Sequence, residues 1–215
     1  MTNDTTLTSP PPRYSPLSMR PSTALIPASL VTLVYVGFYL LSLLRGRQEF
    51  IEAYGVRGFD WSHVGGTLTY SFAHYGTFHL VLNMIPLFLL TAMICYIVGW
   101  REWMGVTILS LLFTGWFAFF TAERNEVIFG ASGITSALGI FLLFTAVLHR
   151  NPFGLLLGAV YSGITIISLV TTMTAQDATA SWHAHLGGLL IGFILFCALR
   201  YLDQRTPGSE GISPR

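Results

Sequence analysis

The chain has 215 residues, of which 53% are hydrophobic and 10% are charged, and its mean hydropathy is +0.62. Soluble domains carry about 25% charged residues, so this composition excludes a soluble globular domain and predicts an integral membrane protein. A formal net charge of +1 does not provide the concentrated basic face that nucleic acids require, so no nucleic-acid partner is expected.

Six apolar runs predict an all-α membrane protein with six transmembrane helices. A polar, proline-rich stretch at residues 1–21 precedes them, and we expect a disordered cytoplasmic tail there because it buries too little apolar surface to order itself. About 20 helical residues cross the hydrocarbon core. The expected membrane domain, residues 22–202, holds runs at 23–44, 77–99, 104–121, 132–149, 153–173 and 182–200. Residues 203–215 are expected to form a short second cytoplasmic tail.

The connection over residues 45–76 is much longer than the other loops. Its length and its glycine and aromatic content predict local structure, lying at the outer membrane interface. Arginine is enriched on the cytoplasmic side of membrane proteins, which allows the orientation to be predicted. With the N-terminus inside, seven arginines lie on the inner side and four on the outer side. Both termini are therefore predicted to be cytoplasmic.

Polar side chains stand near the starts of the second, fourth and sixth runs. They are His79 and Asn83 in FHLVLNM, Ser132 in GASG, and His185 in HAHLGG. A polar group inside a span is a functional hypothesis by default. At 1.5 Å per residue, about 22–27 Å of helix separates Asn83, Ser132 and His185 from the inner ends of their runs. All four side chains are therefore predicted to lie at one depth, somewhat below the outer surface.

Each of these residues also has a structural interpretation. Ser132, between two glycines, is a possible helix cap or a packing residue that lets two backbones approach. A histidine in a span can bond to a neighbouring helix or relay protons. His79 and Asn83 share one helical face at i and i+4, which would also allow them simply to join two helices.

Small residues predict close contact between the fourth and sixth runs. Gly188 and Gly192 form a G-x-x-x-G pair below His185, and Gly133 gives the fourth run a comparable surface. Helices that meet through such faces approach very closely. This contact would bring Ser132 within hydrogen-bonding reach of His185.

A serine and a histidine at this depth predict nucleophilic catalysis. Serine attacks a carbonyl when a base, usually histidine, removes its proton. The oxyanion that forms needs preorganised donors, which the Asn83 amide, the His79 ring and the backbone N–H of Ser132 supply. Gly130 suits a tight backbone path into the helix. Because no carboxylate lies near His185 in the sequence, a Ser–His dyad is expected.

Three segments of the chain resemble the signature segments of rhomboid intramembrane serine proteases. They are FAHYGTFHLVLNM, GASG and AHLGGLLIG, and the resemblance extends over roughly residues 60 to 200. It implies a six-helix bundle around a water-filled cavity open to the outer face. It also implies that Ser132 is the nucleophile and His185 the general base. His79 and Asn83 correspond to the oxyanion-side donors, and His74 to a histidine that supports the preceding loop.

The resemblance implies transmembrane protein substrates, a lipid bilayer environment and no cofactor. It also implies that the fifth span is a gate and that the loop from about residue 174 to 181 is a cap. The chain departs from the family at Ser136, where an aromatic residue often packs on the catalytic histidine. A glycine frequent eight residues after the serine is Ile140 here, whereas Gly139 stands at seven.

Other hypotheses compete with the protease. A non-catalytic membrane protein that binds transmembrane helices would keep the fold without depending on Ser132, and a small transporter or proton channel would use the membrane histidines. His183 is interpreted as a loop histidine at the outer surface. No metal site is expected, because no carboxylate or thiolate cluster accompanies the histidines. The compact form predicts a prokaryotic plasma membrane protein, whereas the sequence leaves the natural substrate and oligomeric state undetermined.

Overall fold

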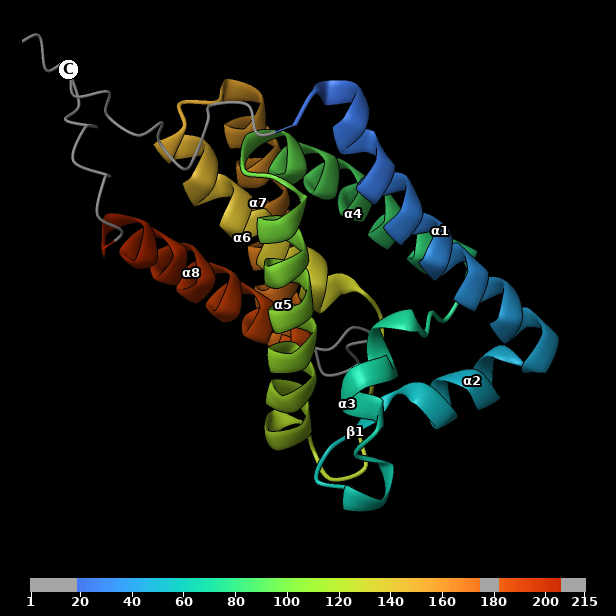
Figure 1. Ribbon diagram of the computed structural model, residues 1–215. Helices are drawn as coiled ribbons and strands as arrows, with labels where there is room; N and C mark the ends of the chain where they lie inside the picture. Colours follow the sequence, from blue (N-terminus) through green and yellow to red (C-terminus); the bar gives the residue numbers. More distant parts are fainter. Residues whose placement is uncertain (1–18, 175–181, 206–215) are drawn as a thin grey trace, which may run out of the picture.

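The computed structural model describes residues 19–174 and 182–205, which form a bundle of helices (Figure 1). Most of the two expected tails and the expected cap at 174–181 lie outside the described residues. The elements are α1 (Pro21–Arg45), α2 (Arg47–Tyr54), β1 (Val56–Arg57), a 3₁₀ helix (Trp61–His63), α3 (Gly66–Thr69), a second 3₁₀ helix (Tyr70–Phe72), α4 (Thr77–Ile97), α5 (Trp100–Thr121), β2 (Val127–Ile128), α6 (Ser132–Leu148), α7 (Pro152–Thr174) and α8 (Trp182–Arg205).

Five helices are long and apolar enough to cross a membrane: α1, α4, α5, α7 and α8. They coincide with five of the predicted runs, so the prediction of an all-α, multi-pass membrane protein is confirmed. The sixth run, α6, is also apolar but has only 17 residues. At 1.5 Å per residue it is about 26 Å long, which is shorter than a hydrocarbon core of about 30 Å.

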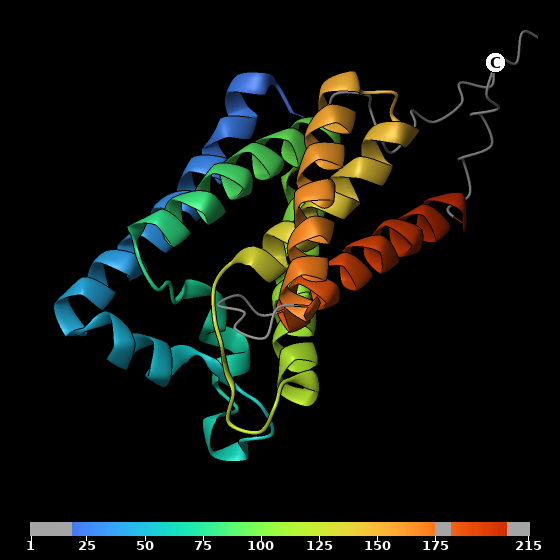
Figure 2. The ribbon, with the colours of Figure 1, turned by 180° about the vertical axis from the view of Figure 1, so that it is seen from behind.

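The short helix α6 occupies the centre of the bundle. It packs against α4, α5, α7 and α8, and Figure 2 shows α7 alongside it. Most of its side chains are buried, including Ile134, Leu138, Phe141 and Leu142. A backbone end at membrane depth is tolerated where protein rather than lipid surrounds it. This enclosure would allow the short helix α6 to end within a membrane without exposing its backbone to lipid.

The long connection between α1 and α4 has the local structure that its length predicted. It contains α2, α3 and both 3₁₀ helices, and α3 lies directly on α5. A Cβ atom on Gly115 of α5 would stand 2.0 Å from the Thr67 carbonyl oxygen, so glycine is required for this contact. The sequence did not predict the antiparallel pair of β1 with β2, in which Val56 faces Ile128. Two-residue strands have no periodic pattern that would reveal them.

Helix α1 packs against α4 and is joined to the outer connection by two tyrosines. The Tyr35 hydroxyl donates to Ser71 Oγ over 3.1 Å, and the Tyr39 and Thr77 oxygens lie 2.9 Å apart. Both bonds tie α1 to the segment that leads into α4. They thereby fix the place where His79 enters the bundle.

Candidate active site

The loop before α6 lies against the histidine at the start of α4. Gly130 has a φ of 104°, a conformation that glycine adopts readily, and its N–H donates to the Tyr70 carbonyl over 2.9 Å. A Cβ atom at Gly130 would stand 3.0 Å from Cε1 of His79. The sequence suggested two roles for Gly130, helix packing and a tight backbone path into the helix; Gly130 precedes α6 and brings the loop onto the His79 ring.

Helices α6 and α8 touch backbone to backbone. A Cβ atom on Gly188 would lie 2.2 Å from the carbonyl oxygen of Gly133, and one on Gly192 would lie 2.3 Å from that of Ala137. One turn closer to the outer end, a Cβ on Gly133 would be 3.1 Å from the Ala184 oxygen. The close contact that the glycines predicted is therefore present.

This contact brings the first residue of α6 beside the first turn of α8. Ser132 is half-buried and directly precedes Gly133, while His185 is 8% exposed and directly follows Ala184. No hydrogen bond joins Ser132 Oγ to His185 within the described part of the chain. Catalytic hydrogen bonds are commonly long in substrate-free enzymes and shorten in the Michaelis complex. The contact of Gly133 with Ala184 therefore places the neighbouring residues Ser132 and His185 at the same end of the α6–α8 interface.

His79 and Asn83 lie on adjacent turns of α4. The Asn83 side chain is buried, and its Nδ2 donates to the His79 carbonyl over 2.9 Å. An amide nitrogen carries two hydrogens, so this bond leaves one N–H of Asn83 for another acceptor. The half-buried His79 ring lies against Gly130, which places it beside the loop that carries Ser132.

His74 supports the His79 ring from outside the helix. The two ring centres are 5.2 Å apart, and His74 is 1% exposed. Its Nδ1 lies 3.3 Å from the Phe72 carbonyl oxygen. Burial, with a smaller contribution from neighbouring His79, lowers the pKa of His74 to about 4. His74 is therefore neutral near pH 7, where its Nδ1–H donates to Phe72.

A polar stripe on α7 faces the site, and the sequence analysis missed it. It consists of Tyr161, Thr165 and Ser168, which are spaced at i, i+4 and i+7. The Tyr161 hydroxyl lies 2.5 Å from Thr135 Oγ1 on α6, and Ser168 Oγ lies 3.4 Å from His185 Nδ1 on α8. Helical spacing of polar residues in an apolar helix was the available signal.

Thr165, the middle residue of the stripe, contacts Ser136, which departs from the family pattern. Thr165 Oγ1 lies 3.5 Å from Ser136 Oγ, and Ser136 Oγ donates to the Ser132 carbonyl over 2.6 Å. A Cβ on Gly188 would be only 2.8 Å from the Cβ of Ser136. Ser136 is therefore enclosed between α7 and α8, and residue 188 must be a glycine for α8 to pass this close to it.

His183 is buried in the first turn of α8, contrary to its interpretation as a surface loop residue. Its Nδ1 lies 3.0 Å from Thr121 Oγ1 at the end of α5, and its Nε2 lies 3.5 Å from Glu126 Oε2. These partners join α8 to α5 and to the loop before α6. His183 thus helps to hold the helix start that carries His185.

The sequence also matches a known protein family. A model of the Rhomboid domain matches residues 60–202. The chain belongs to the rhomboid family. A search of curated proteins found no match. The rhomboid family contains both proteases and non-catalytic members, so membership establishes the membrane fold and leaves catalysis as a proposal.

Two departures from the rhomboid pattern have a packing explanation. Gly139 accepts a ring from α7, because a Cβ there would lie 2.7 Å from Cδ1 of Tyr161. Ile140 instead packs against α8, where a Cβ on Gly192 would lie 2.4 Å from its Cγ2. Gly192 therefore provides the space on α8 that accommodates Ile140.

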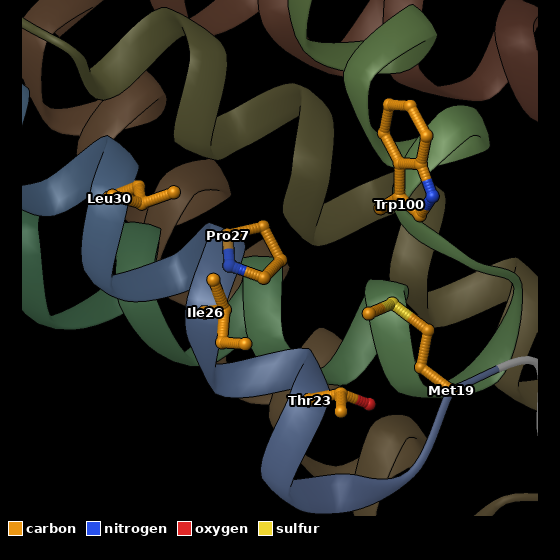
Figure 3. Close-up of a pocket in the computed structure, with 6 residues that line it drawn as sticks. All are labelled: Met19, Thr23, Ile26, Pro27, Leu30 and Trp100. Atoms are coloured by element: carbon orange, nitrogen blue, oxygen red, sulfur yellow. The ribbon is translucent and has the colours of Figure 1, made fainter.

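An apolar groove of about 250 Å³ lies far from these rhomboid motifs (Figure 3). It is lined by Met19, Thr23, Ile26, Pro27, Leu30 and Trp100. Trp100 begins α5, whereas Thr121, which contacts His183, ends it. About 30 Å of helix separates the two ends. The groove contains no ionisable side chain and is not part of the candidate active site.

Proposed function

We propose that this rhomboid is an intramembrane serine endopeptidase that cleaves peptide bonds in or near transmembrane segments of membrane proteins. The observation that carries the proposal is the close contact of α6 with α8 at Gly133 and Gly188. It brings a half-buried serine beside a buried histidine at the starts of two neighbouring helices. The contact of Gly130 with His79 adds a donor on the opposite side of the same loop.

In this mechanism, Ser132 Oγ attacks the scissile carbonyl as His185 takes its proton. The oxyanion that develops accepts hydrogen bonds from the His79 ring, the second Asn83 N–H and the Ser132 backbone N–H. The first N–H groups of a helix have no acceptor within it, which leaves the N–H of Ser132 free for this use. His185 then protonates the leaving amine, and water hydrolyses the acyl-enzyme by the reverse proton path.

We further propose that α6 is a sixth span that starts below the outer surface, within a ring of longer helices. With this topology both termini are cytoplasmic, and the connection over residues 45–76 lies on the outer side of a prokaryotic plasma membrane. Single cysteines placed in residues 60–63 and after residue 202 should react with an impermeant maleimide on opposite sides of sealed vesicles. Labelling of both from one side would contradict the topology.

The activity is tested with purified protein in proteoliposomes that contain a generic transmembrane reporter. Wild type should cleave the reporter and should be labelled by a fluorophosphonate, whereas Ser132→Ala and His185→Ala should do neither. Asn83→Ala should lower cleavage by about 10- to 1000-fold, because one of several oxyanion donors is lost.

Ser110→Ala is the matched control for the nucleophile variant. Ser110 is a buried serine of α5 whose Oγ has no hydrogen-bond partner in the described residues, so its removal should leave cleavage unchanged. Equal cleavage by wild type and Ser132→Ala would refute the protease assignment. A cellular phenotype that Ser132→Ala leaves unaltered, with no cleavage by wild type, would favour the alternative, a non-catalytic rhomboid that binds transmembrane helices.

A further inference from the structure

We propose that Ser168 of α7 is a positioning residue that holds the His185 imidazole in the tautomer required for catalysis. The inference rests on the proposed protease function and deepens it. Ser168 Oγ lies 3.4 Å from His185 Nδ1. A general base must present the lone pair of one ring nitrogen to the serine, so the other nitrogen must carry the hydrogen. Ser168 lies where it can accept that hydrogen.

The Ser168 hydroxyl differs from the hydroxyls that follow it on α7. Thr171 and Thr172 donate to the Ile167 and Ser168 carbonyls over 3.0 and 2.8 Å, and Thr174 likewise donates to Val170. Such back-bonding is the usual behaviour of serine and threonine in membrane helices. The hydrogen bond of Ser168 instead crosses to another helix and ends on the candidate base.

The group that orients the His185 ring is a neutral hydroxyl, because no charged group contacts this ring among the described residues. Catalytic histidines are usually oriented by a third group on the nitrogen that does not face the nucleophile. No carboxylate contacts His185 among the described residues, and the residue that could carry a packing aromatic is Ser136. Ser136 Oγ is already bonded to the Ser132 carbonyl, 2.6 Å away. Ser168 therefore provides the orienting contact from a third helix.

The proton path follows from this geometry. His185 Nδ1–H donates to Ser168 Oγ, which leaves the Nε2 lone pair to accept the hydroxyl proton of Ser132 during attack. The imidazolium keeps Nδ1–H bonded to Ser168 and delivers the Nε2 proton to the leaving amine. In deacylation, water loses one proton to Nε2 and its oxygen bonds to the acyl carbon. Nε2 then returns that proton to Ser132 as the acid departs.

The test compares Ser168→Val, which removes the hydroxyl, with Ser168→Thr, which retains it in a side chain of the same shape. Thr171→Val is the control, since it removes a hydroxyl from the same helix that bonds to the helix backbone. In Ser168→Val, the rates of fluorophosphonate labelling and reporter cleavage should both fall by about 5- to 30-fold, with KM unchanged. Ser168→Thr should recover most of both rates, and Thr171→Val should equal wild type.

A second readout is independent of activity. ¹⁵N-histidine NMR, assigned by comparison with His185→Asn, should show His185 as the Nδ1–H tautomer in wild type and a substantial Nε2–H fraction in Ser168→Val. An unchanged tautomer in Ser168→Val would overturn the proposal. So would slower reporter cleavage with unchanged fluorophosphonate labelling, because that result would assign Ser168 to the placement of α7. If wild type neither cleaves nor reacts, the protease assignment fails, while the tautomer comparison still decides the role of Ser168.

Discussion

Helix α6 is held in two different ways by the helices on either side of the site. Against α8 the contact is backbone on backbone, with Gly188 and Gly192 against the carbonyls of α6. Against α7, from Tyr161 onwards, the contact is made by hydroxyl side chains, including the Tyr161–Thr135 bond. A backbone contact has no rotamer that can adjust, whereas hydroxyl bonds allow small shifts. The position of Ser132 relative to His185 is therefore fixed more firmly than the position of α7.

The first part of α7, near Pro152, resembles the α8 interface more than it resembles the part that ends at Thr174. A Cβ on Gly158 would lie 2.6 Å from the Leu143 nitrogen, and one on Gly154 would lie 3.1 Å from the Ala146 Cβ. Helix α7 is thus closely packed near its start and joined by side-chain bonds further along. Any movement of α7 should pivot about these glycines and open the part near Ser168, next to the candidate site.

Gly188→Ala should have the largest effect, because it disrupts the backbone contact between α6 and α8. The new methyl group would meet the Gly133 carbonyl at 2.2 Å, so α8 must move away from α6. We expect at least a 100-fold loss of cleavage, because misplacement by about 1 Å can cost that much. Overpacking should also lower stability by about 1–3 kcal/mol. Reporter cleavage and thermal unfolding in detergent measure the two effects.

Gly163→Ala is the matched control for this variant. Gly163 lies in α7, and nothing lies within 4 Å of the position of its missing Cβ. Alanine should therefore be tolerated there and should stabilise the helix by up to about 1 kcal/mol. Equal behaviour of the two variants would show that the glycine contact does not set the geometry of the site.

Low pH should weaken a third contact of α6, the one between α4 and the loop at Gly130. The pKa of His74 is about 4 in the folded protein and about 6.5 when unfolded, so the unfolded chain binds more protons between these values. The contribution of His74 to the free energy of unfolding is therefore fully present above pH 6.5. It decreases as the pH falls towards 4, by up to about 3 kcal/mol. His74→Gln should flatten the pH dependence of the unfolding temperature. An unchanged slope would contradict the buried neutral state of His74.

Ser136→Phe tests whether the narrow space between α7 and α8 excludes the aromatic residue frequent in the family. Ser136 is 1% exposed and lies against Thr165 of α7, so a ring there would have to displace packed neighbours. We expect a loss of about 1–3 kcal/mol in stability together with reduced cleavage. Ser136→Ala, which removes the bond to the Ser132 carbonyl and the longer contact with Thr165, should cost less than about 1 kcal/mol. Increased stability in Ser136→Phe would show that this space is larger than the packing indicates.

Tyr161→Phe should have the smallest effect, because the α7 contact is made by several adjustable bonds. Loss of the hydroxyl removes the bond to Thr135, and interhelical bonds of this kind average about 0.6 kcal/mol in membrane proteins. Cleavage should stay within about threefold of wild type. A double-mutant cycle with Thr135→Val measures the coupling directly. A coupling free energy above about 2 kcal/mol would show that α7 holds α6 as firmly as α8 does.

Much of this architecture was predictable from the sequence because hydropathy and small residues act locally. The five long helices coincide with apolar runs, and Gly188 and Gly192 indicated a close helix contact before its partner was known. Ser132 and His185 were proposed as site residues because polar groups are rare in such runs. The length of α6 relative to a full span was less predictable, since it depends on the helices that surround it.

Residues whose role depends on a distant partner were not predictable in this way. Ser168 looks in sequence like Thr171 and Thr172, and only the approach of α8 distinguishes its bond to His185. His183 was assigned to the surface because its partners, Thr121 and Glu126, lie in another helix and a loop. Neither case leaves a periodic or compositional trace at the residue itself.

The α6–α8 contact also has a consequence for how the protein is made. Gly133 emerges from the ribosome well before Gly188, so α6 enters the membrane with its tightest-fitting face uncovered. Proteins are synthesised from the N-terminus at about 5–20 residues per second, which leaves several seconds before α8 arrives. During that interval Ser132 has no histidine of α8 beside it. Under the proposed function, the chain would stay inert towards its own unfinished helices and towards other proteins inserting nearby, and it would gain activity only once α8 has docked.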